Sequence, residues 1–89
     1  MTTVVVTHAV GNMQTWLGGG AERKALFARF CSSYRIFRHT DADRVSIVWE
    51  NVDLKTMQAL LDSPEGRTAE AKHTVMNPID IYVEIDGGT

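Results

Sequence analysis

The chain has 89 residues, 44% of them hydrophobic and 22% charged, and a formal net charge of −2 at pH 7. This composition predicts one folded domain over residues 1–89 and excludes a disordered chain, and no stretch approaches the roughly 20 apolar residues that cross a bilayer. The scattered basic residues argue against nucleic acid as a partner. No export leader is recognisable and Cys31 is the single cysteine, so we expect a cytoplasmic protein.

The first third of the chain predicts a strand followed by a helix. Residues 2–10 (TTVVVTHAV) are rich in β-branched side chains, which favours a strand. Asn12 is a suitable N-cap for a short helical turn that the glycines at 18–20 interrupt. Residues 21–31 then place apolar side chains at helical spacing and predict an amphipathic helix. We expect four charged residues on its exposed surface: Glu22, Arg23, Lys24 and Arg29.

The middle of the chain predicts a hairpin and a second helix. Residues 33–39 and 44–51 are β-prone and alternate, and a turn-like stretch joins them. Asp53 is a natural N-cap for the helix that follows. A second cap at Ser63, with Pro64 in the first helical position, predicts that this helix is kinked or split and continues to about residue 73.

The C-terminal segment predicts the fourth strand. Pro78 prevents a helix from continuing, and residues 79–85 (IDIYVEI) alternate strictly between apolar and polar or aromatic side chains. The resulting order is β-α-β-β-α-β. With a right-handed crossover, this order predicts an α+β ferredoxin-like fold, in which a four-stranded antiparallel sheet has both helices on one face.

The opposite face of this sheet carries too much apolar area for a solvated monomer. Its predicted residues include Val5, Ala9, Phe37, Val48 and Tyr82, interleaved with Thr, Arg, Asp and Glu. Exposed apolar patches of this kind mark interaction surfaces. We therefore expect a homodimer in which a second sheet covers this face.

Several segments in this order resemble the dimeric α+β barrel superfamily, which includes the antibiotic-biosynthesis monooxygenases. The resemblance covers nearly the whole chain and is carried by the order and spacing of five pieces: Trp16, Ser33–Arg38 (SYRIFR), Val45–Glu50, Asp53–Leu54 and Leu61–Glu65 (LDSPE). It implies a homodimer whose two sheets face each other in a barrel. It also implies a ligand pocket between the helices and the sheet of each subunit, often without a metal or flavin.

Four residues are candidates for such a pocket. His8 lies in the most apolar row of the first strand and is the candidate catalytic residue, because a histidine there has a pKa suited to proton transfer. Trp16, Trp49 and His73 are candidate ligand-pocket residues, since aromatic walls suit a flat organic molecule. The alternative interpretation is structural: His8 is a hydrogen-bonded core histidine, the tryptophans are core, and His73 favours a helix C-terminus by its charge.

The sequence predicts no metal and no cofactor. His39 ends the second strand about 10 Å from His8, so the two do not form an obvious metal pair, and no histidine has a ligand at metal-binding spacing. Haem-degrading members of the superfamily place a Trp and a His around a Ser of the second helix. Leu60 and Glu70 stand at those two positions here, so the chain departs from the haem-degrading pattern.

Two functional hypotheses follow from the sequence. In the first, the homodimer binds a small, partly aromatic organic molecule between helices and sheet, and as an enzyme it would be a cofactor-independent monooxygenase or isomerase with His8 as the proton-transfer group. In the second, it is a non-enzymatic dimeric structural or interaction module without a ligand pocket. The sequence leaves open whether the protein is an enzyme and which molecule it binds.

Overall fold

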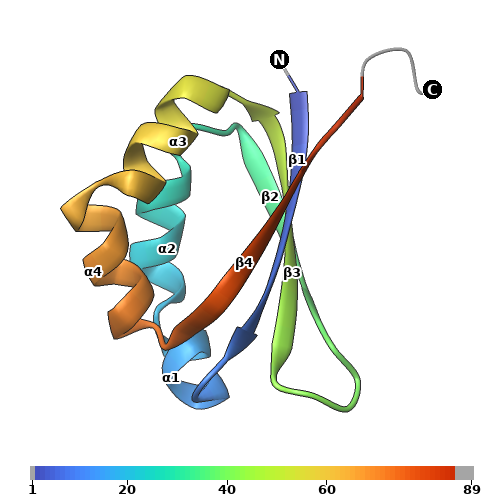
Figure 1. Cartoon of the computed structure of the whole chain (residues 1–89), viewed down its shortest axis with the longest axis vertical. Helices are drawn as coiled ribbons and strands as arrows, with labels where there is room; N and C mark the ends of the chain where they lie inside the picture. The colour runs from blue at the N-terminus through green and yellow to red at the C-terminus, as the bar shows by residue number, and fades with distance from the viewer. Residues whose placement is uncertain (1, 86–89) are drawn as a thin grey trace.

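The computed structural model describes residues 2–85 and consists of a four-stranded sheet with helices on one face (Figure 1). The elements in chain order are β1 (Thr2–Val10), α1 (Met13–Gly18), α2 (Gly20–Phe27), β2 (Ser33–Arg38), β3 (Arg44–Val52), α3 (Leu54–Asp62), α4 (Pro64–Lys72) and β4 (Val75–Val83). The strand order is β2-β3-β1-β4, and all neighbouring strands are antiparallel. The predicted α+β ferredoxin-like fold is confirmed. Each of its two helical segments consists of two helices, α1 with α2 and α3 with α4. Among the described residues no helix has the length and hydropathy of a membrane span.

Local capping interactions explain where the helices begin. The side chain of Asn12 accepts a hydrogen bond from the Thr15 amide at the start of α1, and Asp53 accepts one from the Thr56 amide at the start of α3. At the start of α4, Ser63 accepts a hydrogen bond from the Gly66 amide, and its hydroxyl donates to the Leu60 carbonyl at 2.6 Å. Each cap satisfies an amide that lacks a partner within the helix. Ser63 therefore ends α3 and begins α4.

Two predicted boundaries differ from the structure. The fourth strand begins at Val75 and ends at Val83, whereas the sequence predicted residues 79–85. Pro78 lies inside β4 because β4 is an edge strand, where a residue without an amide hydrogen is tolerated. The helix predicted over residues 21–31 is α2, which begins at Gly20 and ends at Phe27; Phe30 follows it in a turn and is still buried.

The two faces of the sheet differ as the strand alternation requires. On β1, Val4, Val6, His8 and Val10 are buried beneath the helices, as predicted. The opposite face, which we call the open face, has no helix over it (Figure 1). Its apolar residues are Val5, Ala9, Phe37, Val48, Met76 and Tyr82.

Candidate ligand pocket beneath the helices

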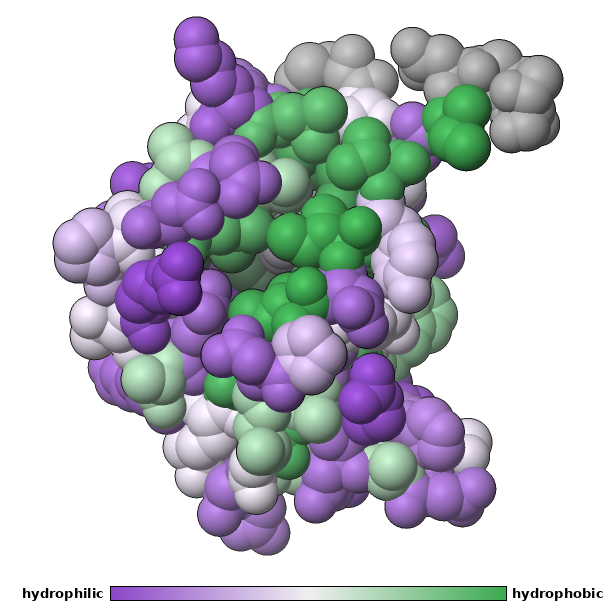
Figure 2. Space-filling view, in the orientation of Figure 1, coloured by the Kyte–Doolittle hydropathy of each residue, from purple (hydrophilic) through white to green (hydrophobic). Residues whose placement is uncertain are grey.

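A cavity of about 80 Å³ lies between the helices and the sheet. Figure 2 shows hydrophobic side chains around a hollow between the helices and β4, and these elements contribute Ala69 and Ile79 to the cavity lining. The lining also includes all four residues that the sequence singled out: His8, Trp16, Trp49 and His73. The fold therefore brings together side chains from β1, α1, β3 and the end of α4.

His8 is buried in this cavity, with 4% of its surface exposed. Its Nδ1 atom lies 2.9 Å from the Ala9 carbonyl oxygen, an acceptor, so Nδ1 carries the proton of the neutral ring. The other nitrogen, Nε2, makes no hydrogen bond to residues 2–85 and has its lone pair available. Burial lowers the pKa of His8, and the nearby Arg23 and Arg44 lower it further. His8 is therefore a neutral base at neutral pH.

The sheet is irregular beside His8. Thr7 pairs with Asp80 and Ala9 pairs with Met76, so residues 77–79 of β4 all stand opposite His8 alone. Such bulges bend a strand and redirect its side chains. Ile79, which lines the cavity, comes from this irregular segment.

Arg23 is a cavity residue that the sequence analysis placed wrongly on the helix surface. Only 6% of it is exposed, and its Cζ atom lies 3.7 Å from the centroid of the Trp16 ring. Its Nη1 atom donates a hydrogen bond to the Trp16 carbonyl at 2.8 Å, whereas Nε is buried without a partner in residues 2–85. The helical spacing could have predicted this burial, because Arg23 precedes Leu26 by three residues and Phe27 by four and so shares their face of the helix.

His73 lies at the end of α4, against α2. It caps α4 through its backbone amide, and its buried ring places Nε2 3.5 Å from the Glu22 carboxylate. A Cβ atom at Gly19 would lie 2.5 Å from that nitrogen. Gly19 therefore provides the space that lets His73 lie inside the cavity wall, which is a specific reason for one of the three consecutive glycines.

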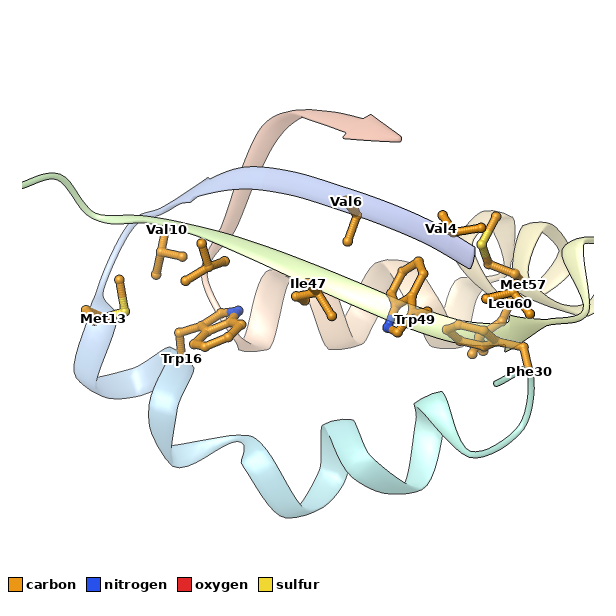
Figure 3. Packing of buried hydrophobic residues seen from close by; sticks show 12 residues of the cluster. Val4, Val6, Val10, Met13, Trp16, Phe30, Ile47, Trp49, Met57 and Leu60 are labelled. Atoms are coloured by element: carbon orange, nitrogen blue, oxygen red, sulfur yellow. The ribbon is translucent and has the colours of Figure 1, made fainter. Parts of the chain in front are cut away.

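The two tryptophans lie toward opposite ends of the cavity (Figure 3). Trp16 is near Val10 and Met13, whereas Trp49 is near Phe30, and Ile47 lies between the two rings. Trp49 makes edge contacts with Phe27 and Phe30, with ring centroids 5.1 and 4.8 Å away. Its indole Nε1 is buried without a partner in the described chain. The Trp49 end is thus an aromatic wall with one free hydrogen-bond donor.

Two other residues considered from the sequence, His39 and Glu70, lie in different places. His39 is exposed, and its Nδ1 accepts hydrogen bonds from the Asp41 and Ala42 amides, so it caps the turn between β2 and β3. Glu70 lines the cavity, and burial raises the pKa of its carboxyl. Within residues 2–85, no group of three or more His, Cys, Asp or Glu side chains is arranged to hold a metal ion.

The fold, but not the sequence, links this chain to known proteins. No family model and no curated protein matches it. A crystal structure of an antibiotic biosynthesis monooxygenase is similar, with a TM-score of 0.68 at 11% identity over 96% of this chain and 97% of that one. SnoaB, a cofactor-independent oxygenase from Streptomyces nogalater, has a TM-score of 0.62 at 16% identity over 96% of this chain and 92% of its own.

A third similar structure is Rv0793 from Mycobacterium tuberculosis, with a TM-score of 0.56 at 13% identity over 100% of both chains. In each case the likeness extends over nearly all of both chains, so it concerns the whole domain and not one motif. At these identities it establishes the fold and leaves the chemistry to the site. The chain therefore has the ferredoxin-like fold of the antibiotic-biosynthesis-monooxygenase-like proteins, as the resemblance in its sequence implied.

Proposed function

We propose that the protein is a homodimer that binds a small, partly aromatic organic molecule in the cavity beneath the helices and transfers a proton through His8. The observation that carries this proposal is the unpartnered Nε2 of a buried, neutral histidine in a cavity lined mostly by aromatic and aliphatic side chains. Apolar cavities with a few polar groups are the usual form of a small-molecule site. The similarity to a cofactor-independent oxygenase supports the same reaction class.

On the protein, the proposed chemistry uses the His8 side chain and the Ala9 carbonyl. His8 Nε2 accepts a proton from an acidic O–H or C–H group of the bound molecule, and the Ala9 carbonyl stabilises the resulting imidazolium through Nδ1. In an isomerisation, the same proton returns to another atom of the molecule. In an oxygenation, O₂ converts an activated CH₂ group into a carbonyl group and water, and the substrate itself supplies the electrons.

Thermal-shift measurements with single-ring phenols and quinones test the binding. At ten times the dissociation constant, a bound compound stabilises the native state by about 1.4 kcal/mol, which raises the Tm of a domain this size by about 6 to 11 °C. Ala69→Leu fills the cavity from α4 and is expected to abolish the shift. Ala71→Leu adds the same side chain at an exposed position of α4 and should leave the shift intact.

The catalytic role of His8 needs a separate measurement. With a compound that binds, oxygen consumption or isomer formation is followed in the wild type and in His8→Gln. We expect His8→Gln to retain binding and to lose about 100-fold or more in rate, since general-base catalysis typically contributes that much. Equal rates in the two proteins would remove His8 from the mechanism. If no compound in the set raises the Tm, the non-enzymatic module becomes the better interpretation.

The homodimer is the second part of the proposal and rests on the open face. Phe37 and Tyr82 are 49% and 59% exposed there, and the Arg35 guanidinium lies 5.7 Å from the centroid of the Phe37 ring. Both signs of charge occur on this face, with Arg35 on β2 and Asp80 on β4, so a two-fold related copy can pair opposite charges around an apolar centre. Sedimentation at micromolar concentration should show a dimer, and a monomer there would contradict this part.

A further inference from the structure

Arg23 is a buried cation that no carboxylate in residues 2–85 neutralises. The ion pairs in this part of the chain join Arg29 to Glu65 and Lys72 to Glu22, and His73 Nε2 lies 3.5 Å from the same Glu22 carboxylate. A guanidinium remains charged in a protein, and burial of an unpaired charge is costly. The Trp16 ring offsets part of that cost through a cation–π contact at 3.7 Å. The remaining cost favours a ligand that supplies the missing negative charge.

The hydrogen bonds of Arg23 leave one edge of its guanidinium free. Nη1 donates to the Trp16 carbonyl, and Nε is buried without a partner. Nε and Nη2 share the opposite edge of this planar group, and their two parallel N–H bonds match the spacing of the two oxygens of a carboxylate. A single phenolate or carbonyl oxygen would use only half of this edge.

The other ionisable groups at the cavity do not replace a ligand anion. His8 is neutral and basic, and it adds no negative charge. Glu70 lines the cavity without approaching Arg23 to ion-pair distance, and burial raises the pKa of its carboxyl, which disfavours its charged form. Glu22 does not line the cavity, and its carboxylate accepts a hydrogen bond from Lys72 at 2.9 Å.

We propose that the cavity takes an aromatic carboxylate, with its two oxygens on Nε and Nη2 of Arg23 and its ring between Trp16 and the aromatic wall at Trp49. This inference rests on the proposed function, because it assigns the ligand class of the same cavity. It adds a charge and an orientation: the carboxylate lies at the Trp16 end, and a hydrogen-bond acceptor on the far side of the ring meets the free Nε1 of Trp49. A cavity of about 80 Å³ suits a molecule with one ring.

Matched probes test the charge on the wild-type protein without any substitution. Calorimetry compares benzoate with benzamide, and 4-hydroxybenzoate with 4-hydroxybenzamide, because each pair has nearly the same shape and differs by one charge. We expect each acid to bind about 10- to 100-fold more tightly than its amide, the range for hydrogen bonds to a charged group. Equal affinities within both pairs would overturn the anion assignment.

Substitutions then locate the charge. Arg23→Gln should reduce benzoate affinity to that of benzamide, while Arg29→Gln, which removes an exposed arginine next in sequence after α2, should leave it unchanged. Arg23→Lys keeps the charge but cannot donate two parallel hydrogen bonds. Its affinity for benzoate should therefore lie between those of the wild type and Arg23→Gln. If Arg23→Gln does not fold, the matched probes still decide the question. Loss of affinity in Arg29→Gln but not in Arg23→Gln would place the anion outside the cavity.

A nuclear magnetic resonance titration of His8 provides a readout that is independent of affinity. Arg23 lowers the pKa of His8, so a carboxylate bound to Arg23 should raise the pKa of His8, and the amide should not. An unchanged pKa with saturating benzoate contradicts the placement on Arg23. The two proposals fail differently: if phenols bind but acids have no advantage, only the carboxylate assignment fails, whereas if no probe of any kind binds, the ligand-binding function fails with it.

Discussion

The helix-covered face of the sheet and the open face are built from alternate residues of the same strands, yet they carry opposite anomalies. Beneath the helices, His8, Arg23 and His73 are ionisable and buried, and the first two lie against the Trp16 ring. On the open face, Phe37 and Tyr82 are apolar and exposed. A buried ionisable group and an exposed aromatic group are both unfavourable for an isolated chain. The first anomaly is the basis of the proposed ligand site, and the second is the basis of the proposed homodimer.

The largest effect is expected from removing an aromatic side chain on the helix-covered face. Trp49→Ala should lower the free energy of unfolding by about 3 to 5 kcal/mol, because it removes a large buried side chain beside Phe27 and Phe30. Denaturant unfolding measures this loss, which should not depend on protein concentration. Tyr82→Ala on the open face is the matched test. Its effect should be smaller and should vary with protein concentration, and a loss as large as that of Trp49→Ala would break the distinction between the faces.

A charge placed at the centre of the open face should separate the two subunits. Val48 lies between Arg35 and Val5 in the sheet, so Val48→Lys would bury a second cation beside Arg35 in the dimer. We expect the dissociation constant of the dimer to rise at least about 100-fold, equivalent to about 3 kcal/mol. Sedimentation equilibrium measures the change. Gln58→Lys adds the same charge on the outer surface of α3 and should leave the dimer intact; if both variants remain dimeric, the subunits meet through another surface.

The junction of α3 and α4 tests whether the helix layer depends on close backbone contact. A Cβ atom at Gly66 would overlap the Leu60 carbonyl oxygen, so Gly66→Ala should lower the free energy of unfolding by about 2 to 3 kcal/mol. Gly20→Ala is the control, because a Cβ there meets nothing within 4 Å. It should stabilise α2 by about 0.5 to 1 kcal/mol. Thermal unfolding of both variants measures the contrast, and equal effects would show that α4 adjusts its position freely.

The smallest effect concerns the pH dependence of stability that His8 contributes. Its pKa in the native state is below the ordinary value of 6.5, so the unfolded chain binds the proton at higher pH than the native protein does. The free energy of unfolding should therefore decrease as the pH falls below about 6.5 and should level off below the native pKa. Urea unfolding between pH 7 and 5 measures this slope. His8→Gln should have a shallower slope, and an identical slope would show that His8 is not buried in its neutral form.

Much of this arrangement was accessible from the sequence because strands alternate strictly. The period of two placed His8 with Val4 and Val6, and Trp49 with Val45 and Ile47, on the face that the helices cover. The caps at Asp53 and Ser63 correctly predicted a split second helix, since capping is a local interaction within four residues.

Two predictions from the sequence were wrong because contacts between distant residues outweighed the local preferences of the residues concerned. Arg23 was expected in solvent because arginine is usually exposed, but the Trp16 ring and carbonyl hold it inside. The fourth strand was expected to begin after Pro78, but at the edge of the sheet β4 needs no amide hydrogen from that residue.

By itself, the sequence determined the order of the elements, the helix starts and the two faces of the sheet, because these follow from short-range periodicity and capping. Only the tertiary structure decided that strands and helices from the whole domain line one cavity, that Gly19 makes room for His73, and that Arg23 is buried with its Nε unpaired. Cavities and unpaired charges depend on which side chains meet across the fold. His8 was therefore a candidate from the sequence alone, whereas the buried charge of Arg23 was identified only from the packing of α2 over the sheet.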